Sequence, residues 1–495
     1  MVFWRVKPLD KILETAEKRS LKRQLGALQL TLLGIGAVIG TGIFVLTAEA
    51  GQKAGPGMMI AFIISAIVCA LAALAYSELA AMVPVSGSAY TYTYGVLGEF
   101  IAWIVGWALG LEYAIGAAVV SVGWSGYMNG LLDRWGFHLP DVLRTGYFAG
   151  GSGINLLACL ISAVVTWLLV IGTSKSAKVN AVLVAIKVAA LTVFIIIALP
   201  AVNSSNFEPF LPGGWGSPTG GVGVLGAAAS IFFAYVGFDA VSTAAEETTN
   251  PNRNIPIGLI GALGICTIFY LLVGYGAAGA AGAQPMLGAN GLPLEPGSAE
   301  MMAACAAKGG EALVCSREPL AYVLTNIGWP ALGGIIRIAA ILALPSVILM
   351  MMFGQTRILF TMSRDGLLPE VLSRVHPRFH TPHVVTILTG VLVMVSSALF
   401  PVGFLAEASN SGTLLAFAMV ALGVLILRKT QPDRKRPFRT PFVWIVCPLA
   451  IAGCLLLFWS LGIKAKMVFV VWGLIGLGLY FGYGYRRSQL ANESA

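Results

Sequence analysis

The stretch Gly34-Ile-Gly-Ala-Val-Ile-Gly-Thr-Gly-Ile-Phe44 places four glycines inside an apolar segment that is long enough to cross a membrane. Each interior glycine costs a helix about 1 kcal/mol relative to alanine, so this density of glycine favours an unwound backbone over a continuous helix. In lipid, unwound backbone is tolerated only where it lines a polar cavity or is buried in protein. The pattern therefore predicts that residues 34–44 form part of a binding site near the middle of the membrane.

The rest of the chain has the composition of a protein with many membrane spans. Of its 495 residues, 57% are hydrophobic and 11% are charged, whereas about 25% of residues in soluble domains are charged. Residues 1–25 lack the apolar core of a cleaved leader, and a span needs about 20 apolar residues. We expect an all-α integral membrane protein with twelve transmembrane helices, at about residues 27–47, 58–82, 99–130, 152–172, 178–200, 221–245, 257–281, 331–362, 384–401, 407–428, 440–462 and 466–485.

The distribution of lysine and arginine predicts the orientation of the chain. If both termini are cytoplasmic, the inside segments hold about three times as many of these residues as the outside segments, as the positive-inside rule requires. The net charge of +9 therefore indicates membrane topology and not nucleic-acid binding. We expect a multi-pass protein of the cell (inner) membrane, embedded in the lipid bilayer. Residues 1–26 form a basic cytoplasmic segment that either lies on the inner leaflet or is a disordered tail.

Among the ionisable side chains of these spans, three are candidates for function: Glu112, Lys187 and Asp239. Such residues usually face a cavity or mark a path for substrate or protons, and a purely structural role is the alternative for Glu112. Lys187 lies nine residues beyond Lys178, about 13 Å along a helix, which is too deep for its side chain to reach the surface. It is a candidate proton carrier or a substitute for a bound metal cation. Asp239 follows Gly237 and interrupts an aromatic run in the sixth span.

The other polar features are expected to be structural. Cys305 and Cys315 lie in a long outside loop at residues 282–330, and they form either a disulfide or two free thiols, because spacing alone does not decide between these states. Arg337, near the outer end of a span, is expected to extend its side chain to the surface. The basic loop from Arg428 to Pro441 is expected to act as a topological anchor.

The sequence predicts no metal centre and no cofactor. His380 and His383 are close in sequence, but neither cysteine nor a carboxylate cluster accompanies them. The chain also has no glycine-rich phosphate-binding loop that ends in lysine, which an internal ATPase would need. No pattern typical of a soluble enzyme is present, so we do not expect an enzyme.

The two interrupted spans are the first and the sixth, so they lie five helices apart along the chain. Broken helices in corresponding positions of two inverted repeats are typical of secondary transporters, whose substrates bind between them. We therefore expect a first repeat of five helices at residues 27–200 and a second of five at 201–430, which includes the loop at 282–330. Residues 431–495 hold the last two helices and a cytoplasmic tail.

The ends of broken helices offer backbone groups to a ligand. Free N–H groups at Thr41 and Gly42 are expected to bind an anionic group such as a carboxylate. Free carbonyl groups are expected to accept hydrogen bonds from an ammonium group. A free α-amino acid supplies both groups on one carbon atom. The residues expected to supply carbonyl oxygens are Val38, Phe233, Ala234 and Val236.

The chain resembles a known family at several motifs. These are Gly36-Ala-Val-Ile-Gly-Thr-Gly-Ile-Phe44, Phe233-Ala-Tyr-Val-Gly-Phe-Asp239, the linker Glu246-Glu-Thr-Thr-Asn-Pro251, and the loops from Arg357 to Pro369 and from Arg428 to Pro441. Over residues 25–485 they resemble the bacterial type of the cationic amino acid transporter branch of the amino acid–polyamine–organocation (APC) superfamily. The resemblance implies a LeuT-type fold and amino-acid transport by alternating access, often coupled to protons.

The same resemblance assigns roles to individual residues. It implies that Lys187 takes the place of the sodium ion of sodium-coupled relatives, so that transport is sodium-independent. It also implies that Thr41, Phe233 and Asp239 line the substrate site. Glu112 matches a carboxylate near the side-chain end of that site.

The predicted function is import of L-amino acids, cationic and/or small neutral, with protons by a secondary active transporter. An exchanger that uses the same site is the main alternative. A channel should show a continuous polar stripe or a charged ring, and a sensor should carry a sizeable soluble domain, neither of which the sequence contains. The sequence does not decide which amino acids are preferred, the oligomeric state, or whether a small membrane subunit binds.

Overall fold

The computed structural model describes residues 5–7, 9, 25–84, 88–151, 153–172, 177–216 and 221–490. Most of the predicted basic segment at residues 1–26 therefore lies outside the described residues. Within the described part the secondary structure is helical, apart from isolated bridges such as that between Leu25 and Thr248. The predicted all-α fold class is confirmed.

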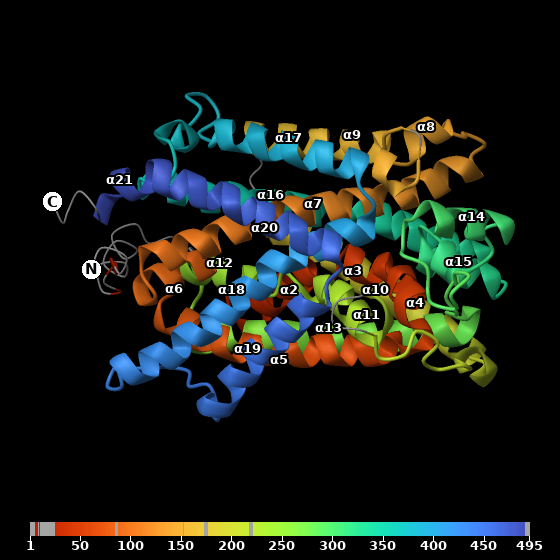
Figure 1. Ribbon diagram of the computed structural model, residues 1–495, viewed down its shortest axis with the longest axis horizontal. Coiled ribbons are helices and arrows are strands. Elements are labelled where there is room, and N and C mark those ends of the chain that lie inside the picture. The colour runs from red at the N-terminus through yellow and green to blue at the C-terminus, as the bar shows by residue number, and fades with distance from the viewer. Residues whose placement is uncertain are drawn as a thin grey trace.

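The helices form an elongated bundle. Figure 1 shows the long helices running along the long axis, with α14 and α15 at one end and α6, α12 and α21 at the other. We call the first of these ends the loop end, because it carries the loop at residues 282–330. The helices are α2 (Ala27–Val38), α3 (Thr41–Phe44), α4 (Leu46–Ala54), α5 (Met58–Met82), α6 (Ser88–Val96), α7 (Glu99–Arg134), α8 (Asp141–Arg144), α9 (Leu156–Ile171), α10 (Ala177–Ala198), α11 (Gly223–Ile231), α12 (Ala240–Thr243), α13 (Pro251–Ala281), α14 (Ala299–Ala307), α15 (Pro319–Asn326), α16 (Pro330–Arg364), α17 (His383–Leu399), α18 (Val402–Thr430), α19 (Val443–Ser460), α20 (Ile463–Leu479) and α21 (Tyr485–Arg487).

Eight helical segments are long and apolar enough to cross a bilayer within the part of the chain that the structure describes. Four further helices are apolar but shorter, with 10–17 residues each. Each predicted span overlaps one of these segments, while the number of crossings itself stays a prediction. The eight are Leu46–Met82, Glu99–Arg134, Ala181–Ala201, Pro251–Ala281, Pro330–Arg364, Val402–Thr430, Val443–Ser460 and Ile463–Arg487, and the shorter four are Ala27–Val38, Leu156–Ile171, Gly223–Tyr235 and His383–Leu399.

The first glycine-rich segment is interrupted where its glycines predict. Helix α2 ends at Val38, and the N–H of Ile39 makes its last helical bond, to the carbonyl of Ile35 at 2.9 Å. Gly40 is extended, with φ −148° and ψ −149°, and α3 begins at Thr41. Two helix ends, with their free backbone groups, therefore lie inside a buried segment.

The second interruption follows α11. A short 3₁₀ helix, η5 (Phe232–Tyr235), ends in the extended residue Val236, and α12 begins at Ala240. Gly237 between them has φ +110°, a conformation that side chains with a Cβ rarely adopt. The backbone turn therefore requires the glycine that the sequence supplies.

The loop at residues 282–330 is a compact cover on the loop end. It contains α14 and α15, and Cys305 and Cys315 form a disulfide. Of the two states that the sequence left open, the structure has the bridged one. Val314 of this loop packs against Gly51 of α4, where a Cβ would lie 3.2 Å from its Cγ1 atom. The loop thus rests on the helix that continues the first break.

One expectation about an arginine residue is wrong, and the basic loop makes a contact that the sequence did not predict. Arg337 does not reach the surface: it is 3% exposed, and its Nε donates to the Glu318 carboxylate at 2.6 Å. Arg428 and Arg436 of the basic loop, for which the sequence predicted an anchoring role, pair with buried Glu78, at 2.8 Å and 3.2 Å. Burial of a carboxylate requires a partner, and these partners are hundreds of residues away in sequence.

Candidate functional site at two helix breaks

The two helix breaks touch each other through their backbones. A Cβ on Gly42 would lie 2.3 Å from the Cα of Ala234, and a Cβ on Gly237 would lie 3.0 Å from the carbonyl oxygen of Ala37. Only glycine permits such an approach. The structure therefore brings the predicted segments around residues 34–44 and 233–239 together.

The carbonyl groups at the end of α2 receive donors from two other helices. The last carbonyls of a helix have no partner within it. Lys187 of α10 is completely buried, and its Nζ donates to the carbonyl of Gly36 at 2.8 Å. The Tyr270 hydroxyl of α13 lies 2.8 Å from the carbonyl oxygen of Val38. A charged and a neutral side chain thus hold the broken end of α2.

Tyr270 also joins the first break to the second. Its hydroxyl lies 2.8 Å from the carbonyl oxygens of both Val38 and Ala234, and its single proton serves one of them at a time. Sequence analysis assigned these two carbonyls to a ligand and missed Tyr270. The available signal was a tyrosine in the middle of an apolar span, because a buried hydroxyl needs a partner.

The N–H groups at the start of α3 are available to a ligand. The next backbone bonds in this turn come from Phe44 and Val45, to Gly40 and Thr41. Within the described part of the chain, no hydrogen bond from the N–H of Thr41 or Gly42 occurs. The Thr41 side chain fits against Gly123 of α7. Free N–H groups at the start of a helix can bind an anion, and the binding role of Thr41 and Gly42 stays a prediction.

The two predicted acidic residues lie near each other beside the breaks. Asp239 is 1% exposed, and its Oδ2 atom accepts a hydrogen bond from the Tyr113 hydroxyl at 2.9 Å. Glu112, also 1% exposed, interacts electrostatically with Asp239. Sequence analysis missed Tyr113, although it directly follows Glu112. The Glu112 carboxylate therefore comes from α7, whereas the Asp239 carboxylate already accepts a hydrogen bond from Tyr113.

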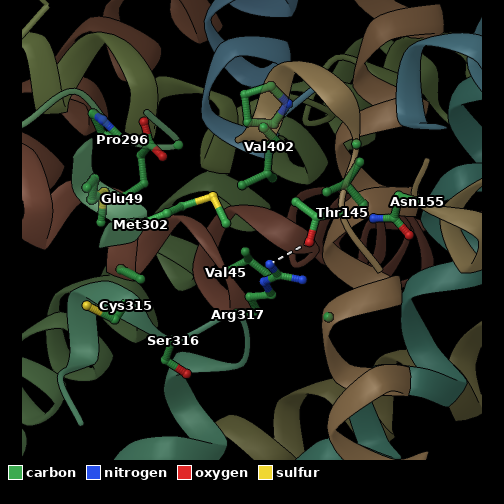
Figure 2. A pocket seen from close by; sticks show the side chains of 18 of the residues that line it. Val45, Glu49, Thr145, Asn155, Pro296, Met302, Cys315, Ser316, Arg317 and Val402 are labelled. Carbon is green, nitrogen blue, oxygen red and sulfur yellow. Dashed lines mark hydrogen bonds between the residues drawn. The ribbon is translucent and has the colours of Figure 1, made fainter. Parts of the chain in front are cut away.

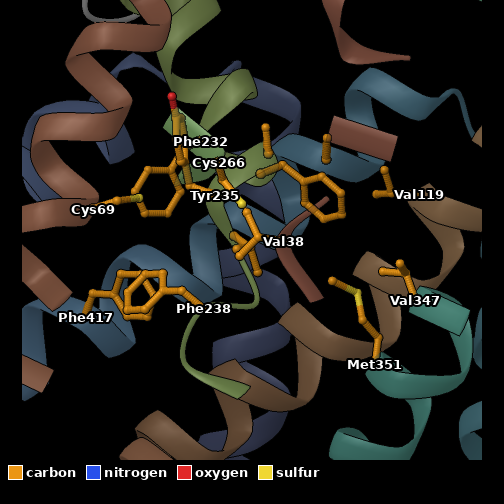
Figure 3. Close-up of a cluster of buried hydrophobic side chains, with 14 of the residues drawn as sticks. Val38, Cys69, Val119, Phe232, Tyr235, Phe238, Cys266, Val347, Met351 and Phe417 are labelled. Atoms are coloured by element: carbon orange, nitrogen blue, oxygen red, sulfur yellow. The ribbon is translucent and has the colours of Figure 1, made fainter. Parts of the chain in front are cut away.

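The surroundings of the breaks are otherwise apolar. Figure 3 shows Val38 near Phe232 of the second break. Aliphatic side chains from α7 and α16 surround it on another side, and these are Val119, Val347 and Met351. Phe233 and Val236, predicted from their carbonyl groups, are buried as well. A ligand at the breaks would therefore have its charged groups near backbone atoms and its remaining atoms in apolar surroundings.

Helix α18 holds the end of α11 with a polar side chain. Asn410 donates to the carbonyls of Ala229 and Ser230, at 2.7 Å and 3.1 Å. Ser409 donates to the carbonyl of Glu112 at 2.9 Å. Sequence analysis missed both residues. The signal was the run of polar residues in the tenth span, since polar groups at membrane depth usually satisfy other groups in the protein.

A cluster of charged residues is buried where α4, α11 and α18 meet. The Nζ of Lys53 contacts the carboxylates of Glu49 and Glu407 and donates to the Ser230 hydroxyl at 2.6 Å. These four residues, which we call the loop-end cluster, are at most 9% exposed. They join α4, α11 and α18. The sequence did not predict this cluster.

A cavity of about 280 Å³ lies on the loop-end side of the cluster. Figure 2 shows Arg317 inside it, with a hydrogen bond to the Thr145 hydroxyl, which measures 2.8 Å. Val45 and Glu49 of the first broken span line this cavity. The predicted site residues do not line this cavity. It is therefore separate from the breaks.

Comparisons with known proteins agree over nearly the whole chain. Residues 25–480 match the family model described as amino acid permease. The chain is 44% identical to the branched-chain amino acid permease BcaP of Bacillus subtilis, over 97% of each chain. It is 39% identical to the methylthioribose transporter of Bacillus subtilis, over 98% of this chain and 99% of that protein. It is 35% identical to the vacuolar cationic amino acid transporter 4 of Arabidopsis thaliana, over 83% of this chain and 64% of that protein.

Proposed function

Because the chain belongs to the amino acid permease family of the APC superfamily, we propose that it imports L-amino acids as a secondary active transporter. The contact between the two helix breaks carries this proposal. The substrate α-carboxylate binds the N–H groups of Thr41 and Gly42, which have no acceptor among the described residues. The α-ammonium binds the carbonyls of Val38 and Ala234, which retain lone pairs beside the Tyr270 hydroxyl.

The surroundings of the breaks favour a neutral, apolar substrate side chain. The aliphatic and aromatic side chains in Figure 3 offer contacts to a branched hydrocarbon, and a relative of 44% identity is named for branched-chain amino acids. A cationic side chain would need a free carboxylate, whereas Asp239 accepts the hydrogen bond of Tyr113. Cationic substrates are therefore the second candidate. They are supported by Glu112 and by the relatives named for them.

We assign proton coupling to Lys187. Its ammonium group donates to the Gly36 carbonyl at 2.8 Å, where a bound cation would stabilise the broken end of α2. Loss of the proton would remove the charge from this contact and weaken the attachment of α2 to α10. A proton can thus bias the position of the first broken span without sodium. Exchange of one amino acid for another is the alternative that uses the same residues.

The proposal includes the architecture that transport requires. Twelve crossings would form two inverted repeats, at residues 27–200 and 201–430, with the breaks in corresponding positions. Residues 431–495 would add two helices. Both termini would then lie in the cytoplasm and the loop end outside the cell membrane. Alternating access would move the repeats around the contact between the breaks.

Binding and transport assays test the proposal separately. Purified protein is screened by thermal unfolding against the twenty L-amino acids and methylthioribose, and stabilisation by branched-chain amino acids is expected. Proteoliposomes with an imposed inward proton gradient should then accumulate the stabilising substrate, without sodium. Uptake that requires internal amino acid but no gradient would support exchange. Absence of stabilisation and uptake for every amino acid would contradict the proposed function.

A further inference from the structure

A large cavity lies between α18 and α20, apart from the helix breaks. Its volume is about 1000 Å³, at the upper end of the range of pockets for drug-sized ligands. One wall is formed by four residues of α20 at a spacing of four, which places them on one helix face. Their exposed fractions lie between 51% and 62%, and all four line the cavity. These residues are Ile463, Met467, Val471 and Ile475.

The length of this wall matches one leaflet of a membrane. Ile463 and Ile475 are twelve residues apart, or about 18 Å along a helix. Half of the hydrocarbon core of a bilayer measures about 15 Å. A free amino acid would fill only a small part of such a slot, whereas an acyl chain of one leaflet would extend along it.

Helix α20, which forms this wall, is anchored to α7 beside the cavity. The indole N–H of Trp107 on α7 donates to the carbonyl of Trp472 on α20 at 2.7 Å, and that of Trp472 donates to the carbonyl of Trp107 at 2.8 Å. Trp103 donates to the carbonyl of Gly476 at 3.0 Å. These bonds fix α20 to the bundle beside the cavity. The space is therefore a defined slot between anchored helices.

Charged residues gather at one end of the cavity, at the start of α20. The N–H of Gly462 donates to the Glu407 carboxylate at 2.8 Å, and Lys464 pairs with Glu295 at the surface. Glu49 and Lys53 also line this end. The lining thus contains three carboxylates and two ammonium groups. Lys464 offsets Glu295, but Glu49 and Glu407 share the single ammonium of Lys53. The lining therefore keeps one negative charge in excess, which favours a head group that carries an ammonium ion.

We propose that this cavity binds a phospholipid whose zwitterionic head group carries a primary ammonium. The acyl chain lies along the four apolar residues of α20. The ammonium lies near the carboxylates of Glu295 and Glu407, and the phosphate lies near the exposed ammonium of Lys464. The site requires only that the protein spans a membrane, so it stands independently of the amino-acid substrate.

Delipidated protein in detergent tests this site with three pure lipids: phosphatidylethanolamine, phosphatidylcholine and phosphatidylglycerol. Phosphatidylethanolamine should raise the midpoint of thermal unfolding more than the other two, and native mass spectrometry should show it retained. The Met467→Trp variant fills the slot and should lose both effects. Val470→Trp is the matched control, because Val470 is 56% exposed on the same helix but does not line the cavity.

The head-group contact is tested by Glu295→Gln, which should reduce the difference between phosphatidylethanolamine and phosphatidylcholine. Equal stabilisation by all three lipids, or a preference for phosphatidylglycerol, would overturn the head-group assignment. Unchanged lipid retention in both Met467→Trp and Val471→Trp would overturn the location. A dimer that Met467→Trp abolishes, with no lipid retained by the wild type, would assign the cavity to a second copy of the chain and overturn the proposal.

Discussion

The helix breaks and the loop-end cluster satisfy their buried polar groups in different ways. At the breaks, side chains serve backbone carbonyls: Lys187 bonds Gly36, and Tyr270 bonds Val38. In the loop-end cluster, charged side chains serve one another, with Lys53 between Glu49 and Glu407. In the first arrangement, Lys187 forms no ion pair with a carboxylate of the residues that the structure describes. The second neutralises the lysine and ties three helices together.

This difference indicates what each region can do. A carbonyl is neutral, so a donor that leaves it can be replaced by another donor, such as a substrate ammonium. An ion pair in a buried cluster is costly to separate, because each charge left alone is poorly solvated. The breaks are therefore suited to exchange of ligands and protons. The loop-end cluster is suited to holding α4, α11 and α18 in place.

The largest expected effect is that of Lys187→Ala on transport. This variant removes the ammonium group that donates to the Gly36 carbonyl, and uptake driven by a pH gradient in proteoliposomes should be abolished. Counterflow of labelled substrate without a gradient serves as the control for binding and folding. Full retention of pH-driven uptake would exclude Lys187 as the coupling residue.

The next effect is on stability, at the loop-end cluster. Lys53→Met leaves two buried carboxylates without their ammonium, and breaking such a cluster typically costs about 3–5 kcal/mol. Unfolding in detergent should show this loss, and the double variant Lys53→Met/Glu407→Gln should recover part of it. Lys464→Met is the matched control, since its surface pair contributes little. Equal stability of the Lys53 and Lys464 variants would show that the cluster does not hold the helices.

A smaller effect is expected for Tyr270→Phe. Loss of one hydroxyl that serves two buried carbonyls should cost about 1–3 kcal/mol, measured by unfolding. Tyr235→Phe is a close control, because its hydroxyl bonds a single carbonyl, that of Phe62, at 3.2 Å. If the substrate ammonium binds the same carbonyls as Tyr270, substrate should restore more stability to Tyr270→Phe than to Tyr235→Phe. The same gain in both variants would argue against this binding mode.

The smallest effect is a change of preference in Asp239→Asn. The amide keeps an acceptor for the Tyr113 hydroxyl but removes a negative charge beside the breaks. Binding or uptake of arginine should therefore fall more than that of leucine, in competition assays on one preparation. An equal loss for both amino acids would contradict a contact between Asp239 and the substrate side chain.

Local features of the sequence predicted where two helices are interrupted and drew attention to three ionisable residues in the spans. The glycines around residues 34–44 and Gly237 mark the breaks because a helix tolerates them poorly and because close backbone contact requires them. Lys187, Glu112 and Asp239 stood out because charge is rare in apolar spans. These inferences need only residue type and position along one segment.

The partners of these residues were not predictable in the same way. Arg337 was expected at the surface and is buried against Glu318, because a sequence does not show which helix covers another. Tyr270 and Asn410 satisfy carbonyls far away in the chain, and an apolar span gives little sign of which carbonyl will lie opposite. The cluster of Lys53 with Glu407 spans 354 residues.

The sequence by itself determined that this protein is helical, lies in a membrane, has helix breaks in two of its spans and belongs with amino acid transporters. Those properties follow from composition, from the helix propensity of single residues and from motifs along one segment. The tertiary structure alone decided that the two breaks touch, which side chains hold their carbonyls, and that a buried ion cluster and a lipid-sized slot lie beside α18. These features depend on how separate helices pack, and packing brings together groups whose distance in sequence carries no signal.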